Sequence, residues 1–148
     1  MFSKSFGYAL RGILYITSMQ DENRSIQVDE IAAALGVPRH FMGKIMKNLV
    51  KHGILSSSKG PGGGFFPNEK TLQTAVIEVA NITEGHGYFE NCALRLTRCN
   101  AQNPCPLHYQ IVTSRDQMKH LLDSTLIKDL LKGSKADLIR GLSTIPII

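Results

Sequence analysis

The stretch "VDEIAAALGVPRHFMGKIMKNLVKHGILSSSKGPGGGFF" (residues 28–66) decides the fold. Apolar residues recur with helical spacing over 28–35, and Gly36 ends this first pattern. Pro38 suits the first turn of a second helix, which runs to about Lys51. Two short helices joined at a glycine-containing turn predict a helix-turn-helix.

The second helix has two faces of different character. The face expected to turn inward carries Phe41, Met42, Ile45 and Leu49. The outward stripe, spaced by four, three and four residues, carries His40, Lys44, Lys47 and Lys51. A basic stripe at this place is typical of a recognition helix, although three lysines are also common on an ordinary solvated helix face. The segment that follows the helix favours the first interpretation.

A hairpin is predicted directly after this helix. The runs "ILSSSK" and "FFPNEK" read as short strands on either side of "GPGGG", which must be a loop because glycine tolerates unusual backbone angles. A hairpin in this position is the wing of a winged helix. An enzymatic phosphate-binding loop is excluded because the run lacks the GKS/T ending and opens no helix. The residues expected to contact DNA are Arg39, His40, Lys44, Lys47, Lys51, Lys59, Gly60, Pro61 and Gly62.

Helical patterns also cover residues 6–19, 71–82 and 107–123. Ser124 is expected to cap a further short helix that ends at Gly133, whereas the tail over 134–148 is ambiguous. The apolar side chains of the helical pattern over 107–123 could pack either in the core of the chain or against a second copy. They are Leu107, Ile111, Met118, Leu121 and Leu122.

The composition limits the class of protein. A content of 43% hydrophobic residues in 148 residues is enough for a packed core, and a formal net charge of +5 favours a polyanionic partner. No stretch approaches the roughly 18 apolar residues that span a bilayer, and Arg11 interrupts the N-terminal apolar run, so we expect a cytoplasmic protein without a membrane segment. No residues are spaced as a nucleophile–base pair, so we expect a protein that is not an enzyme.

All three cysteines lie close together, at Cys92, Cys99 and Cys105, and His108 follows them. Thiolates are soft ligands suited to iron–sulfur clusters, zinc or copper(I). Structural zinc sites usually contain closely spaced cysteine pairs, which are absent here, and the wider spacing suits a loop around a larger object. A thiol–disulfide switch is the alternative, in which two cysteines pair on oxidation and one is left over.

The chain resembles the IscR/NsrR family of bacterial winged-helix transcriptional regulators (the Rrf-two family). The resemblance extends from "YALRGILYI" (8–16) through residues 28–66, with "GPGGGF" as the most specific run, to the cysteine loop. It implies a mainly α fold with a small β-hairpin wing, in which a winged helix-turn-helix DNA-binding domain is joined to a long dimerisation helix. The implied divisions are residues 1–82 for DNA binding, 83–106 for the cluster-binding loop and 107–148 for the dimerisation helix and C-terminal segment.

The resemblance also implies partners and a cofactor. A homodimer would pair through the helix over 107–123 and read a pseudo-palindromic double-stranded DNA operator. Cys92, Cys99 and Cys105 match the family's cluster thiolates, and His108 matches the ligand histidine of the IscR branch. A [2Fe–2S] cluster is preferred and a [4Fe–4S] cluster is possible.

Four departures from the family pattern stand out. The first cysteine gap is one residue longer than in the IscR branch, and Gly7 occupies the place of the NsrR branch's aspartate ligand. Gly43 replaces an acidic residue that filters DNA sequences, and Lys59 replaces the usual wing arginine. Lysine keeps the charge but loses the planar fork of arginine, so phosphate or minor-groove contact survives better than base readout.

The expected function is therefore a DNA-binding transcriptional regulator whose operator affinity depends on a cluster that senses redox state, nitric oxide or iron–sulfur status. Two alternatives stay open at this point. One is a winged-helix regulator controlled by the thiol–disulfide switch. The other is a winged-helix protein-interaction module that does not bind DNA.

Overall fold

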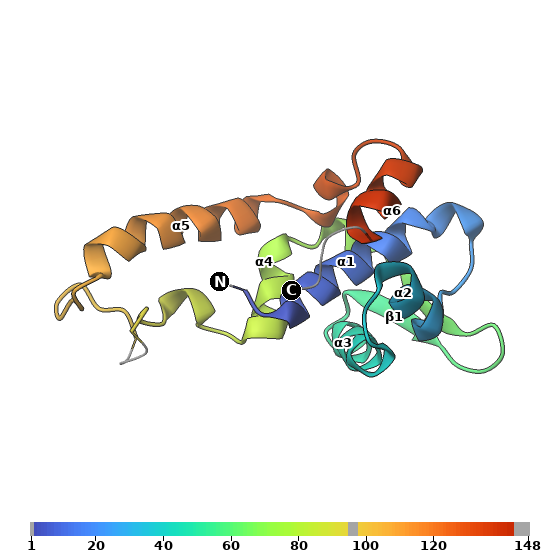
Figure 1. The fold of residues 1–148 in the computed structure, drawn as a ribbon, viewed down its shortest axis with the longest axis horizontal. Coiled ribbons are helices and arrows are strands. Elements are labelled where there is room, and N and C mark those ends of the chain that lie inside the picture. The colour runs from blue at the N-terminus through green and yellow to red at the C-terminus, as the bar shows by residue number, and fades with distance from the viewer. Residues whose placement is uncertain (1, 95–97, 144–148) are drawn as a thin grey trace.

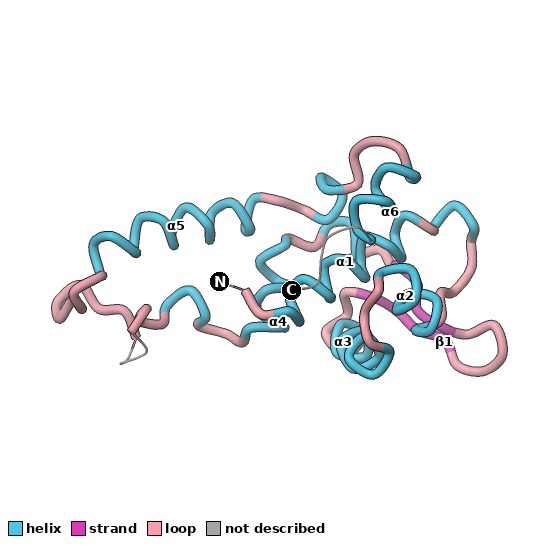
Figure 2. The backbone as a smooth tube through the Cα atoms, in the orientation of Figure 1, coloured by secondary structure: helices cyan, strands magenta, loops and turns pink. Residues whose placement is uncertain are grey.

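A computed structural model describes residues 2–94 and 98–143 and shows a mainly helical chain with one hairpin (Figures 1 and 2). The helices and strands are α1 (Lys4–Ser18), α2 (Val28–Leu35), α3 (Arg39–Lys51), β1 (Leu55–Ser58), β2 (Gly64–Pro67), α4 (Val76–Glu84), α5 (His108–Ser124) and α6 (Lys135–Ser143). Single 3-10 turns are η1 (Gln20–Glu22), η2 (Thr71–Gln73), η3 (Tyr88–Glu90) and η4 (Ile127–Leu130). The predicted fold class is confirmed.

The first helix, α1, runs through the centre of the core. Its Ile13 is fully buried, as are Met42 and Met46 on α3, which crosses it. Gly12 makes this crossing close, because a Cβ placed there would lie 2.6 Å from the Met46 side chain. Apolar burial on this scale stabilises the fold by about 2 kcal/mol for each large side chain. The same packing leaves the opposite side of α3 exposed.

The wing is tied to the helix-turn-helix by backbone hydrogen bonds. Strands β1 and β2 pair antiparallel, with Ser58 opposite Gly64. Ile26, just before α2, exchanges both backbone hydrogen bonds with Phe65 of β2 at 2.8 Å. Gly64 must be glycine because its φ is 141° and a Cβ would lie 2.5 Å from the Ile26 carbonyl oxygen. Gly63 is equally crowded, since a Cβ there would lie 2.5 Å from the Ser58 carbonyl oxygen.

A buried cation joins three helices. Arg11 of α1 is only 9% exposed. Its Nη2 donates to the carbonyl of Leu35 at 2.6 Å, and its Nε donates to the carbonyl of Leu142 at 2.9 Å. These carbonyls belong to the last turns of α2 and α6, which lack intrahelical partners and carry the negative end of the helix dipole. Burial lowers the pKa of Arg11, while the carbonyls at the two helix ends accept hydrogen bonds from Nε and Nη2.

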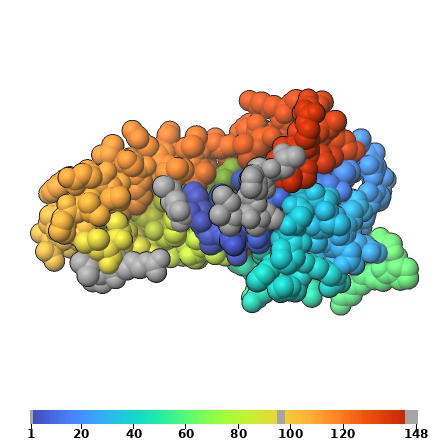
Figure 3. Space-filling model, viewed as in Figure 1, coloured from blue at the N-terminus to red at the C-terminus, as the bar shows by residue number. Residues whose placement is uncertain are grey.

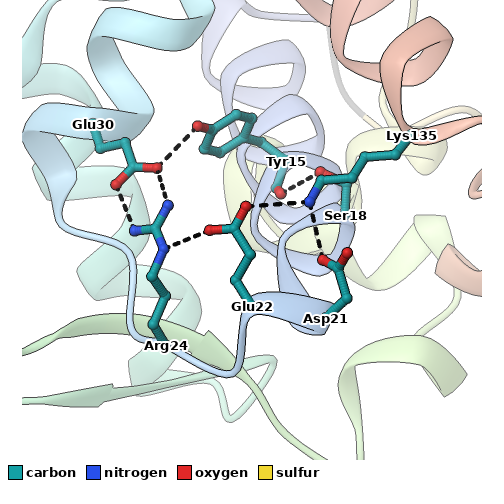
Figure 4. A network of polar contacts seen from close by, with 7 residues as sticks. All are labelled: Tyr15, Ser18, Asp21, Glu22, Arg24, Glu30 and Lys135. Carbon is teal, nitrogen blue, oxygen red and sulfur yellow. Dashed lines mark hydrogen bonds and ion pairs between the residues drawn. The ribbon is translucent and has the colours of Figure 1, made fainter.

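A second, exposed polar network fastens α6 to the α1–α2 connection (Figure 4). Lys135 Nζ lies 3.0 Å from Asp21 Oδ1 and 3.3 Å from Glu22 Oε1. Arg24 contacts Glu22 at 2.6 Å and donates twice to Glu30 of α2, at 2.7 and 2.8 Å. Hydrogen bonds from these cations lower the pKa values of all three carboxyls, with Lys135 as the main cause at Asp21 and Arg24 as the main cause at Glu22 and Glu30.

The prediction of an unbroken helix over 71–82 is wrong. The segment forms η2 and α4 with two extended residues, Thr74 and Ala75, between them. These residues pair with the chain after α5, because Val76 N–H donates to the Thr125 carbonyl and Ile127 N–H donates to the Thr74 carbonyl, both at 2.9 Å. A contact between segments far apart in the chain thus replaces local helical bonds.

The prediction that Ser124 caps a short helix is also wrong. Its Oγ donates back to the His120 carbonyl at 2.8 Å, so Ser124 closes α5. The following turn is η4, where an Asp129 carboxylate oxygen accepts the Leu126 N–H at 2.9 Å. The ambiguous tail forms α6 up to Ser143, while residues 144–148 lie outside the described part of the chain.

The long helix α5 extends away from the helix-turn-helix (Figure 1). The connection between η3 and α5, which carries the cysteines, lies at the far end of this arm, and the wing lies at the opposite end of the molecule (Figures 1 and 3). Within the described residues, we find no helix long and apolar enough to cross a bilayer.

Arg11→Met is expected to lower the free energy of unfolding by about 3 kcal/mol, because two buried carbonyls lose their donor. Chemical denaturation measures the change. Arg140→Met, which alters an exposed arginine of α6, is the matched control and should have little effect. An Arg11→Met protein as stable as the wild type would contradict the role assigned to this cation.

The ion pairs of Lys135 with Asp21 and Glu22 predict that the stability of the fold depends on pH. The carboxyl pKa values of Asp21 and Glu22 lie below their ordinary values of 3.8 and 4.5 in the folded chain. Their contribution to stability is therefore present when the pH is above their ordinary pKa values. It is lost as the pH falls through the lowered pKa values of the folded chain. Lys135→Met should give a shallower loss of stability between about pH 5 and pH 3 than the wild type. Lys119→Met serves as the control. An equal loss of stability with falling pH in all three proteins would show that the network contributes nothing to stability.

Candidate nucleic-acid interface and cysteine loop

One face of the helix-turn-helix is basic and exposed. Helix α3 presents a stripe of exposed side chains at His40, Lys44, Lys47 and Lys51. The apolar face of the same helix packs into the core, where Met42 and Leu49 are fully buried. The basic stripe therefore faces away from the rest of the domain. Rigid presentation of donors and cations on a helix of this kind suits the major groove of DNA.

A groove of about 470 Å³ separates α3 from the wing. Its lining includes Lys47 from α3, Lys59 from the wing tip, and the crowded backbone of Gly63 and Gly64. Lys59, Gly60, Pro61 and Gly62 are all exposed, with positive φ at Gly60 and Gly62 that no other residue type adopts easily. Arg39 and Asp29 also line the groove, so its three cations outnumber its one carboxylate and suit an anion such as a phosphate group.

Arg39 differs from the other predicted contact residues because it has a partner within the chain. Its guanidinium forms an ion pair with Asp29 of α2, and both side chains are largely exposed. Asp29 is a neighbour that the sequence interpretation missed. Its place in the first turn of α2 is an ordinary position for an acidic residue and gave no signal.

Phe41 does not belong to the buried face of α3, contrary to the prediction. Its side chain is 50% exposed, and its ring lies 4.2 Å from that of His40. The helical angle explains the difference, because Phe41 lies at the edge of the apolar face, three positions before exposed Lys44. That spacing is the signal that could have identified it as a surface residue.

The cysteine loop is irregular over its described residues, as predicted, while 95–97 lie outside them. Cys92 is 7% exposed, whereas Cys99 and Cys105 are half-buried thiols. The backbone N–H of Cys99 donates to the Glu90 carbonyl at 2.7 Å, and that of His108 donates to the Cys105 carbonyl at 2.9 Å. These bonds hold one end of the loop against η3 and the other against α5.

Two of the four predicted ligands are in contact. Cys99 Sγ lies 3.1 Å from His108 Nδ1, and His108 is buried at the start of α5, with its ring packed edge-on against Tyr109. Among residues 2–94 and 98–143, no three or more His, Cys, Asp or Glu side chains are gathered as a metal site. The structure therefore brings Cys99 and His108 together but not the full set with Cys92 and Cys105. The donor types, three thiols and an imidazole, fit an iron–sulfur cluster.

The predicted dimerisation residues divide into two groups on α5. Leu122 is buried in the core of its own chain, and Met118 packs against that core. Leu107 and Leu121 are exposed by 42% and 56%, and Ile111 is half-buried. Leu107 and Leu121 are fourteen residues apart, which places them on nearly the same side of the helix.

Comparison with known proteins agrees with the fold. A family model described as Rrf2, an iron-dependent transcriptional regulator, matches residues 2–133. A protein of Aquifex aeolicus named as an HTH-type transcriptional regulator is 32% identical over 133 residues, which cover 88% of this chain and 91% of that protein.

Solved structures show the same architecture. CymR, described as the global cysteine regulator of B. subtilis, superposes with a TM-score of 0.72 at 18% identity, covering 88% of this chain and 95% of that one. The IscR of T. potens gives a TM-score of 0.68 at 15% identity, covering 88% and 85%. These proteins are regulators rather than enzymes. Because the family model covers most of its length, the chain belongs to the Rrf2 family of transcriptional regulators.

Proposed function

We propose that two copies of this chain bind a pseudo-palindromic DNA operator and that an iron–sulfur cluster controls their affinity for it. The observation that carries the proposal is the contact between Cys99 and His108 at the start of α5. These two predicted ligands meet at the N-terminus of α5, which is the helix proposed for dimerisation. A cluster bound there would be attached directly to that helix. The iron dependence in the description of the family supports the same choice of cofactor.

Each proposed ligand has a stated role. Cys92, Cys99 and Cys105 would supply thiolates and His108 a neutral imidazole, with [2Fe–2S] preferred and [4Fe–4S] possible. When bound, the cluster would supply a redox-active, oxidation-sensitive centre that responds to redox state, nitric oxide or iron–sulfur status. The chain would respond by ordering the loop between η3 and α5, because all four ligands lie on that loop or at its junction with the helix.

The DNA-binding part of the proposal uses residues 1–82. His40, Lys44, Lys47 and Lys51 would meet the major groove and its phosphates, with Lys59, Gly60, Pro61 and Gly62 at the minor groove and backbone. Arg39 would join them once it leaves Asp29. The groove between α3 and the wing supports this placement because its lysines suit a phosphate.

The remaining segments complete the proposed regulator. The loop over 83–106 would be the sensor, and residues 107–148 would form the dimer through Leu107, Ile111, Met118, Leu121 and Leu122. Exposed Leu107 and Leu121 support pairing of α5 with its twin, whereas Leu122 and Met118 would hold the helix on its own chain. Such a dimer would act in the cytoplasm and place two recognition helices about one helical turn of DNA apart, or a multiple of it.

A cysteine switch is the second candidate. It is favoured by the half-buried thiols of Cys99 and Cys105 and by the absence, among the described residues, of an assembled ligand set. In this case oxidation would join two of the thiols and change the same loop. CymR, whose description names it a cysteine regulator, shares the fold.

The cluster is tested on protein purified without oxygen, by visible absorption with iron and sulfide assays. We expect charge-transfer absorption with matched iron and sulfide, and its loss in Cys99→Ser. His120→Ala, an exposed histidine of α5, is the control and should keep the cluster. A colourless protein that cannot be reconstituted, with a disulfide in non-reducing mass spectrometry, would replace the cluster by the cysteine switch.

DNA binding is tested by the salt dependence of affinity. Lys44→Ala should weaken binding to duplex DNA and flatten the plot of log K against log salt by about one for each subunit, because one phosphate contact is lost. Lys119→Ala, which removes an exposed lysine from α5, should leave the slope unchanged. An unchanged slope in Lys44→Ala would remove that lysine from the interface. A wild-type chain that binds no duplex at all would favour a protein-interaction module.

A further inference from the structure

Phe41 is an apolar side chain on the most basic surface of the chain. The large exposed hydrophobic residues among those described are Phe41, Leu94, Leu107, Tyr109 and Leu121. Four of these lie in the cysteine loop, at the start of α5 or along α5. Phe41 belongs to α3 of the helix-turn-helix, which lies away from α5 (Figure 1).

The first turns of α3 present few side chains that can contact a base. Arg39 is held by Asp29, Met42 is fully buried, and Gly43 has no side chain. The exposed residues that remain between positions 39 and 44 are His40, Phe41 and Lys44. The N-terminal residues of a recognition helix are those that reach base edges.

The position of the Phe41 ring is restrained. It lies against His40 with 4.2 Å between ring centroids and 37° between ring planes, and it remains 50% exposed. A ring held in place before binding loses less conformational freedom when it meets its target. The ring has no hydrogen-bond donor, so it cannot bind a phosphate oxygen as the neighbouring cations do.

Major-groove DNA offers one apolar group to such a ring. The C5-methyl group of thymine is the apolar feature that distinguishes bases there, and phenylalanine is among the side chains that contact it. The surrounding cations, Lys44 and Lys47, draw a polyanion to this face. A protein partner would have to be acidic and apolar together, whereas duplex DNA supplies both properties.

We infer that Phe41 is a specificity-determining residue that reads a thymine methyl group in each half of the operator. The inference rests on the proposed binding of duplex DNA and adds to it the base that is preferred. His40 positions the ring, and Lys44 holds the adjacent phosphate or base edge.

The test uses random-sequence duplexes selected by the full chain purified without oxygen. A selected duplex is synthesised again with deoxyuridine in place of each thymine in turn, which removes only the methyl group. Dissociation constants are measured for the wild type, Phe41→Ala and Phe41→Leu. Melting curves check that the variants are folded, as expected for an exposed position.

The wild type should lose about fourfold in affinity at one thymine of each half-site, the value of one buried methyl group. Phe41→Ala should show no such loss, and Phe41→Leu should keep part of it because leucine still offers an apolar surface. Equal deoxyuridine penalties in the wild type and Phe41→Ala, or no penalty at any thymine, would overturn the inference while leaving DNA binding intact. Failure of the wild type to select any duplex would overturn DNA binding itself, and the inference with it.

Discussion

The buried guanidinium of Arg11 is the interaction on which the arrangement of the helices depends. A charge in an apolar core is costly unless its donors are satisfied. Here the carbonyls at the ends of α2 and α6 accept two of its hydrogen bonds, so the two helices end beside α1. Because α2 leads through Gly36 into α3, this contact also fixes where the recognition helix begins. The same residue interrupts the apolar pattern of α1 without weakening the core.

Much of the fold was predictable because its boundaries are marked by local chemistry. Gly36 and Pro38 separate two helices, and the glycines of 60–64 allow a turn that other residues cannot form. The errors have a different origin. Thr74 and Ala75 leave the helical pattern because a segment beyond α5 pairs with them, and Ser124 ends a helix instead of starting one. The first contact joins distant parts of the chain and has no local sequence signal, whereas the Ser124 bond is local and goes to the carbonyl four residues earlier.

The candidate site shows the same division between local and distant information. The spacing of His40, Lys44, Lys47 and Lys51 was enough to predict an exposed stripe, because helical angle depends only on position. The pairing of Arg39 with Asp29 depends on how α2 packs beside α3, whereas the spacing of Phe41 from Lys44 could have indicated that Phe41 is exposed. The cysteine spacing indicated ligand chemistry, but only the fold places Cys99 against His108 at the base of α5.

The separation of the cysteine loop from the wing has a consequence for how such a protein can diverge. The two regions lie at opposite ends of the molecule, joined by α1, α4 and α5 (Figure 1). A substitution in the loop therefore touches no residue of the basic face, and a substitution in the wing leaves the thiols unchanged. Descendants of one ancestral chain can exchange the chemistry at one end while inheriting the surface at the other. Closely similar DNA-facing surfaces are thus compatible with very different cysteine loops.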